Sequence, residues 1–284
     1  MHKLKVFFEM IKFEHTLFAL PFAYLGAFLA SNGVPRPGKL LWITLAMVGA
    51  RTAAMSLNRL IDRHIDAINP RTAQRALPAG KLKVTEVYMY TIFSFLLLGY
   101  SAYRLNLLAL MLMPIAVFFL VLYSYTKRFT WACHFVLGIS LGLAPVGAWI
   151  GVTGHWALTP ILLGVGVVTW VAGFDIVYAC QDVEFDRKEG LYSIPAIFGV
   201  QRSLEISSFL HVLAPVFFIA VGVVMPMSWL YYIGVVIAIV LLFRQHRLVS
   251  AEDLSKIGVA FFDLNGYLSI LLFVFSILDL VLLR

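Results

Sequence analysis

The acidic side chains of this 284-residue chain are concentrated in two short segments with the same spacing. The first segment has the pattern N-x-x-x-D-x-x-x-D and the second the pattern Y-x-x-x-D-x-x-x-D. These residues are Asn58, Asp62 and Asp66 in the first segment and Tyr178, Asp182 and Asp186 in the second. Side chains four apart on a helix lie above one another, about 5–6 Å apart at Cβ. Four carboxylates from two helix faces could therefore converge.

Carboxylates brought together repel one another unless a cation joins them. A single pair with this spacing is more often a solvated helix end, but the second copy favours a binding site. Mg²⁺ fits because it prefers hard oxygen ligands and usually binds one or two carboxylates plus phosphate oxygens. Asn58 can add a carbonyl oxygen. Phosphate oxygens can be held by nearby basic side chains, namely Arg63, Arg71, Arg75, Lys81 and Lys127. These residue types predict a magnesium site that takes a diphosphate.

Transmembrane helices must position these acids, because 61% of the residues are hydrophobic and only 13% are charged, against about 25% charged in soluble domains. Only helices satisfy their backbone in the recurrent apolar runs of ~20 residues. The predicted helices cover residues 13–31, 40–57, 84–103, 106–123, 132–150, 158–178, 205–224, 229–243 and 259–282. We expect an all-α polytopic membrane protein, with nine transmembrane helices bundled around a central cavity. Its single domain, residues 1–284, would contain two pseudo-repeats, about 1–125 and 126–284.

The basic residues predict the orientation in the membrane. All but five of the 22 Lys and Arg lie in segments that this helix count places on one side, the exceptions being Arg36, Lys39, Arg51, Arg104 and Arg284. By the positive-inside rule, the N-terminus is cytoplasmic, the C-terminus is outside, and the acids lie near the cytoplasmic face. We expect a protein of the bacterial inner membrane, surrounded by lipid. The net charge of +7 then reflects topology, and nucleic-acid binding is not expected.

A diphosphate that binds at the inner edge of a bilayer, below an apolar and aromatic cavity, is best matched by a polyisoprenyl diphosphate. Its departing diphosphate leaves an allylic carbocation, which aromatic faces stabilise. Asp175 lies inside a predicted transmembrane helix, where an acid costs ~3 kcal/mol or more without a partner. It is therefore either part of the site or one end of a helix-to-helix hydrogen bond.

These segments resemble the two acidic motifs of the UbiA family of intramembrane aromatic prenyltransferases, present here as "NRLIDRHID" and "DVEFD". The run "RTAQRALPAGKL" resembles the family's loop after the first motif, and "YSYTKR" resembles the end of its fourth helix. The stretch "FDIVYACQDVEFDRKEGLYSIPAIFG" is close to the whole second motif region. Together with nine predicted helices, the resemblance extends over almost the full chain.

The resemblance implies roles for individual residues. It implies that Mg²⁺ and the diphosphate are bound by Asn58, Asp62, Asp66, Asp182 and Asp186. It implies further diphosphate contacts from Arg63, Arg75, Tyr123 and Lys127. It also implies an acceptor pocket with Asp175 and Tyr178, and Lys12 and His15 of the first helix are available for an acceptor carboxylate. The four motif aspartates and Asp175 would be the catalytic set.

The implied reaction is a magnesium-dependent alkylation that joins a polyprenyl group to an aromatic acid. The first helix reads "IKFEHTLFALPFAYLGAFLA", where the usual 4-hydroxybenzoate enzymes of the family have a Lys and a Pro in place of His15 and Thr16. We expect a 4-hydroxybenzoate-type acceptor in respiratory quinone biosynthesis. The alternative acceptor is 1,4-dihydroxy-6-naphthoate or a related naphthoate of menaquinone biosynthesis. An alternative of another class is an ion-coupled secondary transporter, although its acids should lie near the bilayer midplane.

Overall fold

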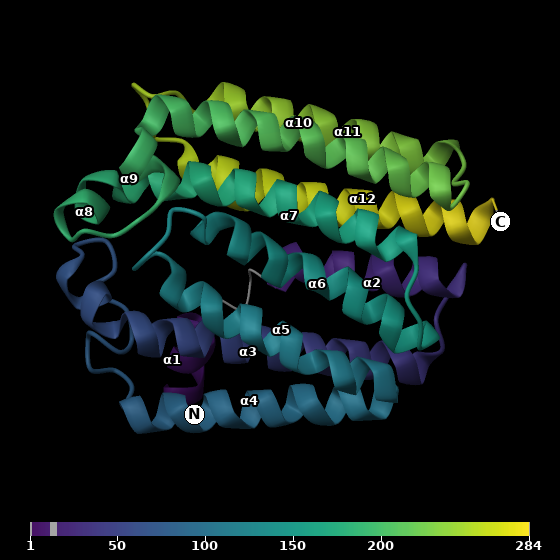
Figure 1. Ribbon diagram of the computed structural model, residues 1–284, viewed down its shortest axis with the longest axis horizontal. Helices are drawn as coiled ribbons and strands as arrows, with labels where there is room; N and C mark the ends of the chain where they lie inside the picture. The colour runs from purple at the N-terminus through teal and green to yellow at the C-terminus, as the bar shows by residue number, and fades with distance from the viewer. Residues whose placement is uncertain (1, 12–15, 284) are drawn as a thin grey trace.

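The computed structural model describes residues 2–11 and 16–283, and within these ranges it contains helices and no strand. Long helices run side by side between the two ends of the molecule (Figure 1). They are α2 (Thr16–Ser31), α3 (Pro37–Ile68), α4 (Val84–Leu105), α5 (Leu107–Thr126), α6 (Cys133–Thr153), α7 (Leu158–Ala179), α10 (Val200–Val224), α11 (Trp229–Leu248) and α12 (Leu264–Leu282). The shorter elements are α1 (His2–Met10), η2 (Cys180–Asp182), α8 (Val183–Lys188), α9 (Ile194–Phe198) and η3 (Val259–Asp263).

The all-α membrane class is confirmed, because seven of the described helical segments are long and apolar enough to cross a bilayer. These segments are Pro37–Ile68, Leu107–Thr126, Cys133–Thr153, Leu158–Lys188, Val200–Val224, Trp229–Leu248 and Val259–Leu282. Within the described residues, each of the nine predicted ranges overlaps a helix. However, α4 and the short apolar part of α2, Ala19–Ser31, fall outside the group of seven. Nine membrane crossings therefore remain a prediction.

The helix α3 extends well past its predicted end at residue 57 and stops at Ile68. Sequence reasoning ended it where polar residues begin. In the structure Asn58 and Asp62 remain on the helix, and the Asn58 Nδ2 atom donates to Asp62 Oδ2 at 2.9 Å. The helix continues because these polar side chains face a polar cavity instead of lipid. The first acidic motif is thus held on a rigid helix.

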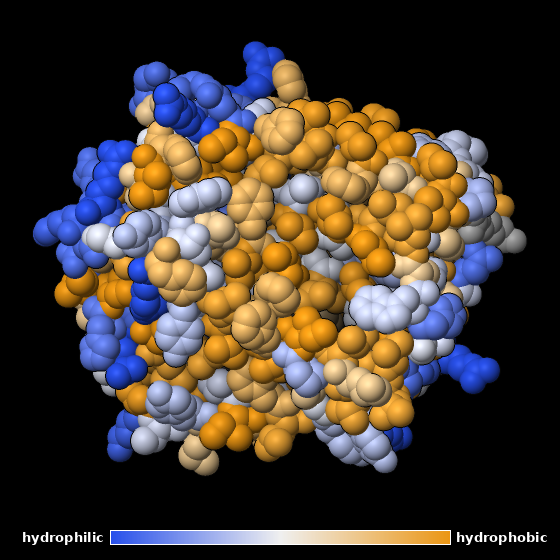
Figure 2. Space-filling model, in the orientation of Figure 1, coloured by the Kyte–Doolittle hydropathy of each residue, from blue (hydrophilic) through white to orange (hydrophobic). Residues whose placement is uncertain are grey.

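The outer surface is apolar over a broad middle zone. Figure 2 shows hydrophobic residues across the centre of one face, hydrophilic residues at both ends, and a hollow right of the centre. Exposed side chains of this kind include Phe93 and Leu96 on α4, Phe118 on α5 and Val223 on α10. Such continuous apolar exposure suits lipid contact and not water.

The helix α7 forms the centre of the bundle, packed against α6 on one side and α10 on the other. Trp170 of α7 is fully buried, lies 5.1 Å from the ring of Phe22, and donates from Nε1 to Asn265 Oδ1 at 2.8 Å. The backbones of α6 and α7 come close at Gly142 and Gly164, where a Cβ on either residue would lie within 3 Å of the other's carbonyl oxygen. Small residues of this kind allow tight helix contact in membranes. The second acidic motif therefore begins at the end of a helix that is tightly packed in the bundle.

The elements that follow the two motifs meet at one end of the bundle. Figure 1 shows α8, α9 and the loop after α3 together at the left. The amphipathic helix α1 packs at this end, where Phe7 and Met10 contact a cluster that includes Leu60, Leu82 and Val87. Helix α1 thus packs against the loop after α3, and this loop lies beside the second motif.

Candidate active site

A cavity of about 290 Å³ lies between α3, α5, α6 and α7, at the end of the bundle that carries the two acidic motifs. Most of the residues singled out from the sequence line it. They are Asn58, Asp62, Asp66, Arg75, Tyr123, Lys127, Asp175, Tyr178, Asp182 and Asp186. The structure therefore brings the two acidic motifs to one polar hollow, although they are far apart in the sequence.

The two carboxylates of the first motif are buried and face basic partners from two other segments. Asp62 is 4% exposed, and its Oδ1 accepts from Arg128 Nη2 at 2.7 Å. Asp66 is 5% exposed, and its Oδ1 accepts from Arg75 Nη1 at 2.7 Å. The Oδ2 atom of Asp66 is buried and has no hydrogen-bond partner among the described residues. A buried carboxylate oxygen without a donor is costly, so this atom is suited to a cation.

The second motif continues from α7 through the tight turn η2 into α8. Asp182 accepts from both Arg71 Nε, at 2.9 Å, and Arg71 Nη2, at 2.5 Å. Arg71 also lies over the Tyr178 ring, 5.4 Å from its centroid. Asp186 is buried and accepts from Ser193 Oγ at 2.9 Å. Arg71 comes from the loop after α3, so this bidentate pair joins the two motif regions across the cavity.

The electrostatics of this pair favour a fixed charge on Arg71. Partial burial lowers the pKa of the guanidinium, but the hydrogen bond and the negative charge of Asp182 outweigh burial and raise the pKa above its ordinary value. Arg71 therefore remains a cation at the mouth of the cavity. A bidentate guanidinium of this kind matches a carboxylate or a phosphate equally well.

Asp175 has both of the roles that the sequence left open. Its Oδ2 atom lies 2.7 Å from Nδ1 of His134, which links α7 to α6. The same carboxylate lines the cavity and is 17% exposed. It lies about one turn before Tyr178 on α7, within the helix and not in the loops that follow the motifs.

The donor set fits a hard cation. Carboxylate and amide oxygens from Asn58 and the motif aspartates surround the hollow. In the described part of the chain no three His, Cys, Asp or Glu form a preformed metal cluster. Instead, Arg71, Arg75 and Arg128 each hold one carboxylate. Mg²⁺ usually needs only one or two protein carboxylates together with substrate phosphates, so these residues suit it without a preformed cluster.

Two residues suggested for the site, Arg63 and Lys81, do not line the cavity. Arg63 donates from Nη1 to the carbonyl oxygen of Leu60 at 2.8 Å and does not line the cavity. It follows Asp62 directly, so the helical rotation of about 100° per residue turns it away from the acid face. Lys12 and His15 lie outside the residues that the structure describes.

Sequence reasoning missed two partners of the acids, Arg128 and His134. Arg128 stands beside Lys127 in the run "YSYTKR", and only the turn after α5 shows that it reaches Asp62. His134 is buried at 2% exposure near the start of α6. A histidine inside an apolar helical segment is a signal that the sequence did offer, because such residues are rare in membranes without a partner.

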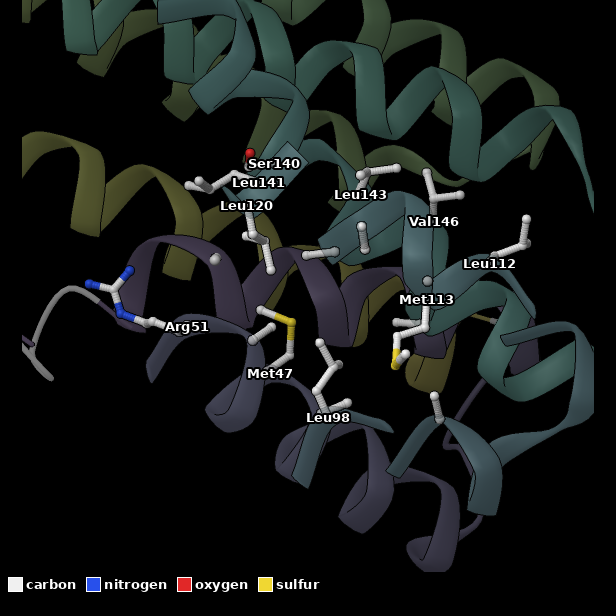
Figure 3. A pocket seen from close by; sticks show the side chains of 18 of the residues that line it. Met47, Arg51, Leu98, Leu112, Met113, Leu120, Ser140, Leu141, Leu143 and Val146 are labelled. Carbon is white, nitrogen blue, oxygen red and sulfur yellow. The ribbon is translucent and has the colours of Figure 1, made fainter. Parts of the chain in front are cut away.

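An apolar cavity of about 240 Å³ adjoins the polar one between α3, α4, α5 and α6. Both cavities are lined by Arg51, Met55, Tyr123, Leu137 and Leu141. Figure 3 shows Met47, Leu98 and Met113 around this space and Arg51 at one end of it. On α5 its lining extends from Tyr123 back to Ala109, a helical rise of about 21 Å. The molecule thus combines a polar head site with a long apolar channel.

Comparisons with known proteins agree with this arrangement. The sequence model described as the UbiA prenyltransferase family matches residues 19–273. The chain is 27% identical to 4-hydroxybenzoate octaprenyltransferase of Photobacterium profundum, over 96% of each chain. It is 26% identical to the enzyme of the same name from Francisella tularensis subsp. mediasiatica, over 89% of this chain and 88% of that relative.

Solved structures share the fold. The apo structure of a UbiA homologue from Aeropyrum pernix is 31% identical, with a TM-score of 0.86 over 94% of this chain and 98% of that one. A homologue from Archaeoglobus fulgidus, solved with GPP and Mg²⁺, is 21% identical and has a TM-score of 0.75 over 97% and 99% of the two chains.

Proposed function

We infer the reaction from the premise that this chain belongs to the UbiA prenyltransferase family. We propose that it transfers a polyprenyl group from a polyprenyl diphosphate to an aromatic acid of the 4-hydroxybenzoate type, in respiratory quinone biosynthesis. Membership in an enzyme family replaces the ion-coupled transporter that the sequence left as an alternative. We place the reaction at the cytoplasmic face of a bacterial inner membrane, with the N-terminus inside and the C-terminus outside.

One observation carries the proposal: the polar cavity adjoins the apolar one, and both are lined by Arg51, Met55, Tyr123, Leu137 and Leu141. A molecule with a doubly charged head and a long hydrocarbon tail matches this pair of cavities. The tail would lie along the channel between α3 and α5, past Met47 and Met113. The head would lie among the motif carboxylates and their arginines.

Mg²⁺ and the diphosphate would be held by Asn58, Asp62, Asp66, Asp182 and Asp186. The buried Oδ2 atom of Asp66, which lacks a donor among the described residues, supports a cation at this position. Bound Mg²⁺ supplies positive charge that neutralises the departing diphosphate. The Archaeoglobus fulgidus homologue of the same fold was solved with GPP and Mg²⁺.

The arginines that pair with the acids are the natural contacts for phosphate oxygens. Arg71 and Arg75 each donate to a motif carboxylate from the loop after α3. Lys127 lines the same cavity from the end of α5. As the diphosphate enters, these cations can exchange a carboxylate oxygen for a phosphate oxygen without leaving the site. We expect the side chains to hold and orient the leaving group in this way.

The transfer itself breaks the bond between the allylic carbon and the diphosphate oxygen and joins that carbon to the aromatic ring. The leaving diphosphate keeps the electron pair of the broken bond. The faces of Tyr123, Phe174 and Tyr178 line the cavity and can stabilise the allylic cation. The surrounding apolar helices exclude bulk water, which would otherwise trap the cation as an alcohol.

The names of the curated relatives support a 4-hydroxybenzoate-type acceptor. Arg51, at the junction of the two cavities, offers a cation for its carboxylate. Tyr178 and Asp175 would line the acceptor side. A naphthoate acceptor remains the second candidate, because the first helix has His15 and Thr16 where the 4-hydroxybenzoate enzymes have Lys and Pro.

The test is an assay of purified protein in lipid with Mg²⁺, a labelled polyprenyl diphosphate and both acceptors in parallel. We expect prenylated 4-hydroxybenzoate that disappears on chelation and in Asp62→Asn and Asp182→Asn. Glu184→Gln is the matched control, since Glu184 lies between the two motif aspartates but is exposed and outside the cavity. Product from the naphthoate alone would mean that the acceptor is the naphthoate and not 4-hydroxybenzoate. No product from either acceptor would overturn the proposed function.

A further inference from the structure

We propose that Asp175 removes the ring proton during prenyl transfer and that His134 is the residue that keeps Asp175 ready to do so. This inference rests on the proposed function and adds the proton acceptor to it. It starts from a contact that the diphosphate site does not use. Within the described part of the cavity, the motif aspartates bond to arginines, asparagines or Ser193, whereas Asp175 bonds to an imidazole.

The hydrogen bonds of His134 fix which of its nitrogens carries the proton. The backbone N–H of Ile194 donates to Nε2 at 3.3 Å, so Nε2 acts as an acceptor. The proton must then be on Nδ1, which lies 2.7 Å from Asp175 Oδ2. Asp175 Oδ2 therefore accepts this hydrogen bond from His134, which fixes the orientation of the carboxylate that we propose as the base.

The position of Asp175 suits the acceptor and not the metal. It precedes Asp182 by seven residues on the same helical stretch, about 10 Å deeper along the axis. The residues on either side of it in the cavity are the aromatic Phe174 and Tyr178. His134 occupies Oδ2 from the protein side, so the partly exposed carboxylate presents its remaining surface to the cavity. An aromatic ring placed between the allylic carbon and α7 would have its ring hydrogen near this group.

The step balances without any further reactant. The allylic C–O bond breaks with its electron pair going to the diphosphate, and the allylic carbon bonds to a ring carbon. The ring carbon then loses its proton to the Asp175 carboxylate, and the C–H electron pair restores the aromatic ring. His134 stays neutral and donates throughout, so it acts through Asp175 as a positioning residue. Without that donor, Asp175 Oδ2 would lose the hydrogen bond that orients the carboxylate, and the carboxylate would be poorly placed to take the ring proton.

The same contact could serve only to join α6 to α7, and the experiment separates the two readings. His134→Phe keeps a planar ring but removes the donor. His134→Asn keeps an N–H donor at a position close to that of Nδ1. His211→Gln is the control, because it changes another buried histidine packed on α7, which bonds to Trp170 and His246 outside the cavity.

The readout is the rate with acceptor whose ring is deuterated at the position of attack. In the unchanged protein we expect loss of diphosphate to limit the rate and the isotope effect to be close to one. In His134→Phe we expect kcat to fall by about 10²-fold, the lower range for a lost general base, with an isotope effect well above one. The KM for the prenyl diphosphate should not change. His134→Asn should restore most of kcat and remove the isotope effect. His211→Gln should show no isotope effect.

Two results would overturn the inference while leaving the proposed function intact. One is a His134→Phe protein that is folded and prenylates the acceptor with unchanged kcat and no isotope effect. The other is a loss of activity that His134→Asn fails to rescue and that parallels a loss of thermal stability, which would make the contact structural. Failure of the proposed function would look different, because the unchanged protein would then give no prenylated acid at all.

Discussion

Two buried aspartates, one at each end of the bundle, show how this fold separates structural acids from site acids. Asp279 of α12 is fully buried at the end away from the two motifs, and its two oxygens accept from the backbone N–H groups of Ser228 and Tyr231 at 3.0 Å each. Asp66 of α3 is almost as buried at the end that carries the motifs. Only its Oδ1 is bonded, to Arg75, and its Oδ2 has no partner among the described residues.

The difference lies in how completely each carboxylate is satisfied. Asp279 caps the start of α11, where the first N–H groups of a helix need acceptors and favour negative charge. Nothing is left for a ligand to bind. Asp66 keeps a buried oxygen that the protein does not satisfy, a cost that is reasonable only if a cation completes the site. A buried acid is thus informative through its missing hydrogen bond and not through its burial.

The largest effect on activity is expected from substitution of Asp66. Asp66→Asn should lower kcat/KM by about 10²–10³-fold, the range for loss of one preorganised charge-stabilising group. Prenyl transfer measured at saturating Mg²⁺ is the readout. Its thermal unfolding should change little, because asparagine keeps an oxygen that can accept the one hydrogen bond from Arg75. Near-normal activity in this variant would remove Asp66 from the site.

Substitution of Asp279 should lower stability and leave activity unchanged. Asp279→Asn replaces one accepting oxygen by an NH₂ group and leaves one buried N–H of α11 unsatisfied, which costs about 1–3 kcal/mol of stability. Unfolding in detergent measures this loss. The activity of the folded fraction should match that of the unchanged protein. A stable but inactive Asp279→Asn protein would contradict the purely structural role of Asp279.

Larger side chains can be introduced at two depths of the apolar cavity. Ala54 and Ala46 line it on α3, eight residues and about 12 Å apart, with Ala54 nearer the acids. Ala54→Phe should impair every donor. Ala46→Phe should slow a long-chain donor by about tenfold, the cost of a tight apolar pocket rejecting extra carbons, yet spare geranyl diphosphate. Equal effects of both variants on both donors would show that the tail does not follow this channel.

The smallest effect is expected from Arg71→Lys. Lysine keeps the charge but cannot donate to both oxygens of Asp182 as Arg71 does. The pair is partly exposed, so we expect KM for the prenyl diphosphate to rise about three- to tenfold, ~1 kcal/mol. Steady-state kinetics measures this change. An unchanged KM would show that Arg71 does not contact the diphosphate.

The sequence was most informative where periodicity and residue type coincide. Apolar runs predicted the helices, and the spacing of four placed Asp62 and Asp66 on one face of a helix that is indeed continuous through both. The boundary at residue 57 was wrong because a polar residue in a membrane helix does not end the helix if it faces a polar cavity. Hydropathy counts cannot see which way a side chain faces.

The contacts between distant segments could not be predicted in the same way. Arg128 reaching Asp62 depends on the turn after α5, and His134 reaching Asp175 depends on the close approach of α6 to α7. Arg63, by contrast, could have been rejected from the sequence alone, because its neighbour Asp62 faces the cavity. Local spacing determines a helix face, whereas long-range partners require the packing.

The most direct test of the central claim is a double-mutant cycle between Asp66 and Asp182, read as Mg²⁺-dependent binding of a prenyl diphosphate to protein in nanodiscs. If the two motifs share one site, Asp66→Asn and Asp182→Asn each remove most of the binding, and the double variant loses far less than the product of the two single losses. Losses that simply multiply would mean two independent sites and would contradict the account.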